Sequence, residues 1–462
     1  MESSDTKQVS EAMKYVVARI ERLPATRYMW AVFLVASFGY FFDFFEVSML
    51  GAVAPSVAKT MGVSTTAGTL LITVTLLGMM VGAAFGGILA DKYGRKSMFM
   101  ITLVGWGSLA FITAFSPNYS TMLTLRIFTG VFLGIEIPTL DSYVNEMMPT
   151  AMRGRYFQTV FAVFEWYVPL IFVLSYFIVP ISPQAWRYMF IIGGAFAVPI
   201  WIGRLILPES PRWLVVSNRV DRANKTLSFM EAHVERNLGK KLPEPNVSTI
   251  DLKEIATEKV PVLDVLRGGN LRLSLMWMPI YFLSFFAWYF FITAIPSILV
   301  EVGYSVINAL TYVVPVAVAT AAFAALPIFT IDTRIGRKGT YWYSGIILII
   351  SSLLYILIPS PITLIIFGST NAGMVTIWAD VVHQWGPETY SNRIRGTATG
   401  FNYAFARLGA AFAPFVGVVV AHTYGLSGVF FVGVLVTIVA MILAWAVPET
   451  KKRLLENIPP GA

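Results

Sequence analysis

The sequence predicts an all-α integral membrane protein with twelve membrane-spanning helices in two pseudo-symmetric six-helix bundles. Three observations predict this fold: an apolar composition, a repeat of about half the chain length, and turns that alternate in charge. Hydrophobic residues make up 56% of the 462 residues and charged residues only 13%, with a mean hydropathy of +0.68. Soluble proteins carry roughly a quarter charged residues. The chain is therefore built to face lipid.

The repeat is visible in the charged turns. Gly94-Arg95-Lys96 returns half a chain length later as Gly336-Arg337-Lys338, and Glu146 and Glu388 keep the same spacing. Arg153 and Arg395 do so too, and Pro208-Glu209 returns as Pro448-Glu449 at nearly that spacing. Features that recur in one order at nearly one spacing indicate two copies of a half-length unit.

Runs of about 20 apolar residues, the length that a spanning helix needs, occur six times in each half. They lie near 29–57, 67–90, 97–116, 120–145, 156–180, 187–207, 271–300, 304–331, 339–358, 361–384, 394–421 and 425–447. We therefore expect a segment 1–28, a bundle 29–207, an amphipathic linker 208–270 with one or two helices, a bundle 271–447 and a tail 448–462.

Lys and Arg gather at the two ends of the chain, in the linker and in every second turn, as in Lys92, Arg95 and Lys96. The positive-inside rule then places both termini and the linker in the cytoplasm of a multi-pass cell-membrane protein. The net charge of +8 thus sets topology and does not indicate nucleic-acid binding. There is no cysteine, and the three histidines are scattered. Metal-site and enzyme motifs are absent, so we expect neither an enzyme nor a cofactor.

Ionisable residues inside spanning helices are costly, and they mark functional sites. Asp43 and Glu46 lie mid-way along the first helix and share a face, and Arg407 lies in the eleventh. Two close carboxylates beside an arginine can take up and release a proton. We therefore expect function at these three positions. Asp141 and Asp380 lie near helix ends, where a charged group can reach the interface, and a structural role is expected for His383.

A second set of charges lies in the turns on the predicted cytoplasmic side. These residues could form ion pairs that latch the two halves together and break when the protein changes state. The alternative is that the arginines merely fix topology. The duplicated set favours the latch, for which the predicted residues are Asp91, Arg95, Glu146, Arg153, Glu209, Arg212, Asp332, Arg337, Glu388, Arg395 and Glu449.

On these residues the whole chain resembles the major facilitator superfamily. The stretch from Gly86 to Lys96 resembles its signature turn, and Pro208 to Leu214 resembles the sixth-helix exit of sugar porters. Asp43-Phe-Phe-Glu46, the fourth helix from Arg126 to Pro149, and Arg407-Leu-Gly-Ala410 are similar to aromatic-acid/proton symporters and synaptic-vesicle-glycoprotein-like members. The first helix departs from that pattern at Phe44 and at Glu46 itself.

The resemblance implies a proton-coupled symporter of a small organic anion, such as an aromatic or aliphatic carboxylate, that works by alternating access as a monomer. It implies proton coupling through Asp43, Glu46 and Arg126, with the proton as coupling ion and no cofactor. The expected substrate-binding residues are Arg407, Glu136, Glu165, Tyr40, Asn402, Tyr403, Trp288 and Tyr289. Three alternatives stay open: a sugar or polyol symporter, a drug/proton antiporter, and a membrane nutrient sensor that does not transport.

Overall fold

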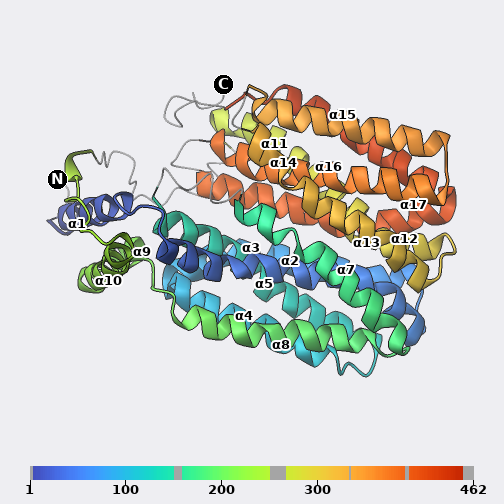
Figure 1. Ribbon diagram of the computed structural model, residues 1–462, viewed down its shortest axis with the longest axis horizontal. Coiled ribbons are helices and arrows are strands. Elements are labelled where there is room, and N and C mark those ends of the chain that lie inside the picture. Colours follow the sequence, from blue (N-terminus) through green and yellow to red (C-terminus); the bar gives the residue numbers. More distant parts are fainter. Residues whose placement is uncertain (1–3, 150–158, 250–266, 332–333, 391–394, 451–462) are drawn as a thin grey trace.

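The computed structural model describes residues 4–149, 159–249, 267–331, 334–390 and 395–450. Helices fill almost all of this part of the chain, and they form two bundles that lie side by side (Figure 1). Both ends of the chain lie at one end of these bundles, which we call the termini end; the other is the opposite end.

The first bundle contains six spanning segments. They are α2 (Arg27–Met61), α3 (Thr65–Tyr93), α4 (Arg95–Thr113), α5 (Tyr119–Met147), a segment that ends in α7 (Tyr167–Ile178), and α8 (Trp186–Leu205). Residues 159–164 are the helical start of the fifth segment, and η1 (Val179–Ile181) ends it. Side chains set the limits of these helices: Ser64 caps α3 and Asn118 caps α5, each accepting a hydrogen bond from a backbone N–H.

The second bundle begins with a broken helix. Its first span runs through α11 (Gly268–Trp288), the π-helical η5 (Tyr289–Thr293) and α12 (Ile295–Glu301). Then follow α13 (Val306–Phe323), α14 (Leu326–Thr330), α15 (Gly336–Leu357), α16 (Pro361–Glu388) and α17 (Arg395–Trp445). A π-helical turn inside a helix often marks a functional site.

Twelve spans are present, as predicted. Among the described residues, 11 helical stretches are long and apolar enough to cross a membrane. The last of these covers two spans, because α17 has 51 residues and changes direction at Gly425, whose φ of 66° is left-handed. The prediction of an all-α membrane fold with two six-helix bundles is therefore confirmed.

Glycines bring α3 and α5 into close contact. A Cβ added to Gly78 or Gly82 would run into backbone carbonyls of Ile127 and Val131, and one on Gly130 would run into Thr75. Small residues at this spacing let two helices approach closely inside a bilayer. These glycines therefore allow tight helix packing within the first bundle.

The two bundles are joined by several pairs of helices. Contacts run between α3 and α17, between α7 and α13, and between α2 and α12. Thr73 of α3 donates a hydrogen bond of 2.8 Å to the carbonyl of Ala411 in α17. Gly51 of α2 leaves no room for a Cβ against Thr293 in η5. The bundles thus pack directly on each other along these helices.

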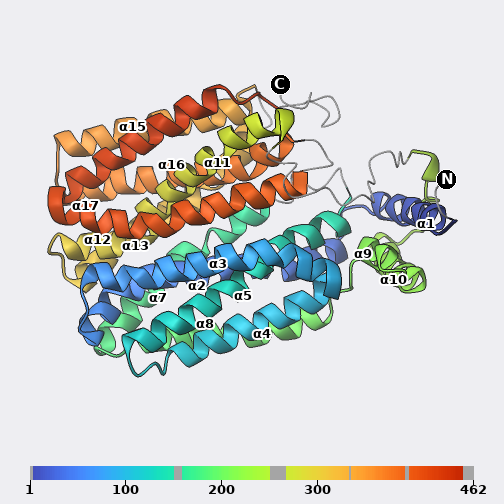
Figure 2. The same cartoon turned by 180° about the vertical axis from the view of Figure 1, so that it is seen from behind.

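In the described part of the chain, three further helices lie at the termini end and extend beyond the two bundles (Figures 1 and 2). They are α1 (Ser4–Glu21), α9 (Pro211–Val216) and α10 (Val220–Leu238), with a short turn η2 (Val247–Thr249). The linker was expected to be helical, whereas α1 had no counterpart in the sequence prediction. Arg19 of α1 pairs with Glu231 of α10 through contacts of 2.9 and 2.6 Å, so α1 is held on α10.

Candidate functional site

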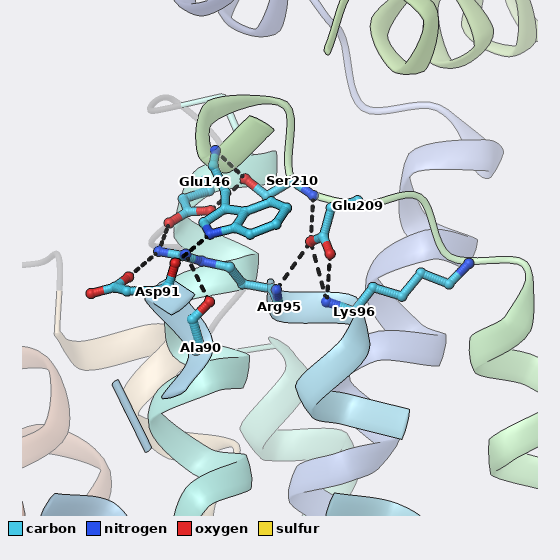
Figure 3. A network of polar contacts seen from close by, with 8 residues as sticks. Ala90, Asp91, Arg95, Lys96, Glu146, Glu209 and Ser210 are labelled. Atoms are coloured by element: carbon cyan, nitrogen blue, oxygen red, sulfur yellow. Dashed lines mark hydrogen bonds and ion pairs between the residues drawn. The ribbon is translucent and has the colours of Figure 1, made fainter. Parts of the chain in front are cut away.

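The charged turn of the first bundle forms a closed network (Figure 3). Arg95, the first residue of α4, contacts Asp91 at 2.8 Å and Glu146 of α5 at 2.7 Å. Glu209 accepts hydrogen bonds from the backbone N–H groups of Arg95 and Lys96, at 3.1 and 3.2 Å. Those N–H groups have no partner within the helix, so a carboxylate is favoured at this end.

The second bundle repeats most of this network in its described residues. Arg337 contacts Glu388 of α16 at 3.0 Å. Glu449 accepts hydrogen bonds from the backbone N–H groups of Arg337 and Lys338, at 3.2 and 2.9 Å. Ser210 donates to Glu146 in the first network, and Thr450 donates to Glu388 in the second, at 2.5 Å. The duplication predicted from the sequence therefore extends to individual hydrogen bonds.

Each of these contacts lies within one bundle or joins it to the segment that follows its last helix. Arg212 was predicted to belong to the latch, and its guanidinium lies 3.7 Å from the carboxylate of Glu21 in α1. Arg153 and Asp332 lie outside the described residues, as does the side chain of Arg395. The described contacts stabilise each bundle internally, and the latch between the bundles remains a prediction.

Inside the first bundle, Glu46 of α2 and Arg126 of α5 form an ion pair. Their closest atoms lie 3.0 Å apart, and both side chains are fully buried. Arg126 also donates to Thr113 Oγ1 at 3.0 Å and stacks on the ring of Phe190. Gly193 of α8 faces Glu46, where a Cβ would collide with the carboxylate. The pair expected from the sequence is therefore formed; the side chain of Asp43 lies outside the described residues.

A second buried ion pair lies in the same bundle. Glu136 of α5 contacts Arg204 of α8 and accepts a hydrogen bond of 2.8 Å from the indole of Trp106. Arg204 also donates to the carbonyl of Phe99 at 3.1 Å. Glu136 was predicted to bind substrate, but both its carboxylate oxygens already have partners in the bundle. The structure thus gives Glu136 a structural ion pair, and the sequence analysis had not singled out Arg204.

Glu165 and Asp380 come from different bundles and are both buried at the interface. Glu165 precedes α7, Asp380 lies in α16, and the two carboxylates are within range of an electrostatic interaction. Asp380 is only 4% exposed and Glu165 only 8%. One oxygen of each carboxylate, Glu165 Oε2 and Asp380 Oδ2, has no hydrogen-bond partner in the described structure. The expectation that Asp380 reaches the membrane surface is therefore wrong, because α16 extends well beyond it and buries it between the bundles.

Arg407 of α17 lies in the same region between the bundles. It is 1% exposed and donates a hydrogen bond of 3.0 Å to the hydroxyl of Tyr289 in the π-helical turn. Its guanidinium lies over the rings of Tyr403 and of Phe44, at 5.1 and 5.7 Å from their centres. Phe44 belongs to the first bundle. A buried cation thus lies against aromatic groups from both halves.

Further aromatic and polar groups surround Arg407. The hydroxyl of Tyr403 lies 3.2 Å from Nε2 of His383, and the centre of the His383 ring lies 5.6 Å from that of Phe161 in the first bundle. Phe161 in turn contacts the ring of Tyr40 at 5.7 Å. Trp288 lies 6.3 Å from Phe44 across the same interface. His383 therefore belongs to this interface, which its isolated position in the sequence did not indicate.

Asn402, another residue expected to bind substrate, also lies on a helix of this interface. Asn402 of α17 is fully buried and donates to the hydroxyl of Tyr390 at 3.4 Å. Its carbonyl oxygen Oδ1 has no hydrogen-bond partner in the described structure. We call the following set the central cluster: Tyr40, Phe44, Phe161, Glu165, Trp288, Tyr289, Asp380, His383, Asn402, Tyr403 and Arg407.

Two bundles related by an internal repeat, with buried charges and a broken helix at their interface, define a secondary transporter fold. A sequence model of the Major Facilitator Superfamily matches residues 36–391. The chain belongs to the major facilitator superfamily. It is a multi-pass membrane protein of a transporter family, and the resemblance predicted from the sequence is confirmed.

The relatives of the chain include transporters of aromatic acids. The niacin transporter NiaP of Acinetobacter baylyi is 29% identical over 455 residues, 96% of this chain and 99% of the relative. The gallate transporter of Pseudomonas putida is 25% identical over 86% and 87% of the two chains. A partially occluded inward-open structure of the xylose transporter XylE from E. coli has a TM-score of 0.71 at 18% identity, over 92% of this chain and 99% of that one. At this identity, the likeness to XylE concerns the fold alone.

Proposed function

We propose that this protein is a proton-coupled symporter of a small organic anion, an aromatic or aliphatic carboxylate, that works by alternating access. The observation that carries this proposal is the buried guanidinium of Arg407, set against the rings of Phe44 and Tyr403 between the bundles. A guanidinium binds a carboxylate in a bidentate manner, and flat aromatic faces suit a flat ring. The niacin and gallate transporters among the relatives support the same substrate class.

Glu46 and Arg126 support the coupling to protons. Both are fully buried, and Glu46 Oε1 has no hydrogen-bond partner among the described residues. We propose that a proton binds at Glu46 together with Asp43, and that protonation weakens the pull of Arg126 on this carboxylate. Protonation and substrate then bias the same two-state equilibrium, which is the condition for coupling.

The central cluster supports alternating access. It draws side chains from α2 and the fifth span of one bundle and from α11, η5, α16 and α17 of the other. A ligand bound between them contacts both halves, so it can stabilise one relative arrangement of the bundles over another. We propose that the termini end faces the cytoplasm of a cell membrane, because the basic turns gather there, and that one chain suffices.

Purified protein in liposomes with a trapped pH-sensitive dye tests the proposal. Addition of an aromatic carboxylate such as benzoate should acidify the interior, and Arg407→Ala should abolish this signal. Arg272→Ala, which removes an exposed arginine of the same bundle, should leave it intact. Unchanged acidification in Arg407→Ala would refute the role of Arg407 as substrate counter-ion.

The same assay separates the alternatives. Acidification by sugars or polyols alone would favour a sugar symporter, and alkalinisation by a cationic drug would mean antiport. No response to any compound, from protein shown to be folded, would favour a uniporter or a sensor. The organic anion is preferred because the central cluster combines a buried cation with apolar rings, whereas a sugar needs many neutral hydrogen-bonding groups.

A further inference from the structure

Glu165 and Asp380 are the part of the central cluster that an organic anion does not explain. They are two buried carboxylates from opposite bundles, and each has an oxygen without a hydrogen-bond partner. A buried charge normally has a partner, because its transfer from water is costly. Such a pair is relieved by a proton that binds to the two carboxylates or by a positive group beside them. An anionic substrate without a cationic group supplies neither.

Among the described residues, no basic side chain forms an ion pair with Glu165 or Asp380. The nearest basic residue along α16 is His383, one helical turn from Asp380, and it pairs with Tyr403. Arg407 is engaged by Tyr289 at 3.0 Å. By contrast, the buried carboxylates of Glu46 and Glu136 each have an arginine. Among the buried carboxylates of the described spans, Glu165 and Asp380 therefore differ in having no arginine as an ion-pair partner.

The surroundings of the pair suit a cationic nitrogen. Tyr167 of α7 follows Glu165 by two residues and is buried beside it at the interface. Its ring stacks on that of Phe44, with centres 5.9 Å apart. Aromatic faces attract cations through the negative charge of their π-systems. Carboxylates and aromatic rings together form the type of site that binds ammonium and pyridinium groups.

We propose that Glu165 and Asp380 bind a positively charged nitrogen of the substrate while Arg407 binds its carboxylate. The transported acid is then zwitterionic, with a carboxylate and a cationic nitrogen on one small molecule. Phe44 links the two ends of the site, because its ring stacks on that of Tyr167 and also lies against the Arg407 guanidinium. This inference rests on the proposed function and narrows its substrate class.

The site also requires both bundles. Glu165 belongs to the first bundle, whereas Asp380 and Arg407 belong to the second. A bound cationic nitrogen would offset the repulsion between the two carboxylates and so hold the bundles together around the substrate. An acid without the nitrogen would bind Arg407 and leave the carboxylates uncompensated, which favours zwitterions over simple acids.

The test compares two acids of similar shape. Benzoate carries only the carboxylate, and N-methylpyridinium-3-carboxylate adds a permanent positive charge on the ring. Dissociation constants are measured with the full-length protein in detergent, for the wild type and for Glu165→Gln and Asp380→Asn. The amides keep the volume of the side chains, and thermal unfolding curves check that each variant is folded.

We expect the wild type to bind the zwitterion at least about tenfold more tightly than benzoate. Each amide variant should lose this preference and bind benzoate as tightly as the wild type or more so. Glu165→Asp, which keeps the charge, should retain part of the preference. N-methylpyridinium without a carboxylate should bind more weakly than the zwitterion.

Several results would overturn the inference while the proposed function stands. One is equal binding of both acids by the wild type. Another is an equal loss of affinity for both acids in the amide variants, which would mean that the pair only supports the structure of the site. A third is a variant that moves fewer protons per benzoate without any change in preference, which would make the pair a proton site. Binding of neither acid by the wild type would instead count against the proposed function.

Discussion

Replacement of Glu46 by Gln tests both the stability and the coupling role of the buried ion pair. The substitution keeps the size of the side chain but leaves the Arg126 guanidinium without its 3.0 Å carboxylate partner. Removal of one member of a buried pair costs about 3–5 kcal/mol, because the remaining charge is uncompensated. Arg126 keeps Thr113 and the Phe190 ring as partners, so we expect a loss near the lower figure.

The double variant Glu46→Gln/Arg126→Gln separates stability from coupling. It removes both charges, so most of the lost stability should return. The free energy of unfolding is measured by denaturant titration in micelles. If the pair were only structural, the double variant would also recover transport driven by a pH gradient.

Transport is measured in two modes in liposomes. One pH unit supplies about 1.4 kcal/mol per proton, enough for roughly tenfold accumulation of substrate. Glu46→Gln should lose this accumulation while it still exchanges labelled for unlabelled substrate across the membrane. Tenfold accumulation per pH unit in a folded Glu46→Gln variant would refute the assignment of Glu46 as a proton carrier.

Three further substitutions follow from individual contacts. Gly193→Ala should destabilise the protein by more than about 1 kcal/mol, because the added Cβ would collide with a buried carboxylate. Gly203→Ala on the same helix is the control, since the nearest atom to its Cβ lies at 3.5 Å. Equal unfolding curves for the two variants would contradict the prediction. Glu209→Gln and Glu449→Gln should each lower stability by about 1–3 kcal/mol as measured by denaturant unfolding, because each carboxylate accepts several backbone N–H groups. Burial alone would raise the pKa of Glu231, but the hydrogen bonds from two arginines lower it below its usual value. The docking of α1 on α10 is therefore fully stabilised above about pH 5 and weakens as the pH falls toward the lowered pKa. Spin-label distances should report this, and an acid-insensitive distance would contradict it.

The fold follows from the sequence because a bilayer leaves few alternatives. Backbone groups in lipid must be satisfied within the helix, so each long apolar run becomes a spanning helix. The repeat of Gly94 at Gly336 and of Glu209 at Glu449 then indicates two equivalent bundles. The networks around Arg95 and Arg337 involve residues that the repeat singled out, but the sequence predicted contacts between the two halves and did not give their partners within each bundle.

The sequence alone did not indicate how the buried charges pair. The sequence offered no reason to distinguish Glu136 from Glu165. In the structure, Glu136 pairs with Arg204, whereas Glu165 lies near Asp380 of the second bundle. The helix α1 was also missed, because its polar composition gives no signal of the surface on α10 that holds it. Such pairings depend on helix rotation and on the packing of the bundles.

What the sequence determined by itself is the number of spans, the duplication and the presence of costly charges within the membrane. Each follows from local composition and spacing, since the bilayer sets the length and polarity of every span. Only the tertiary structure decided which charges meet. Glu165, Asp380 and Arg407 lie far apart in the chain, and they come together where the two bundles pack on each other, with Gly51 of α2 in close contact with Thr293 of the π-helical turn.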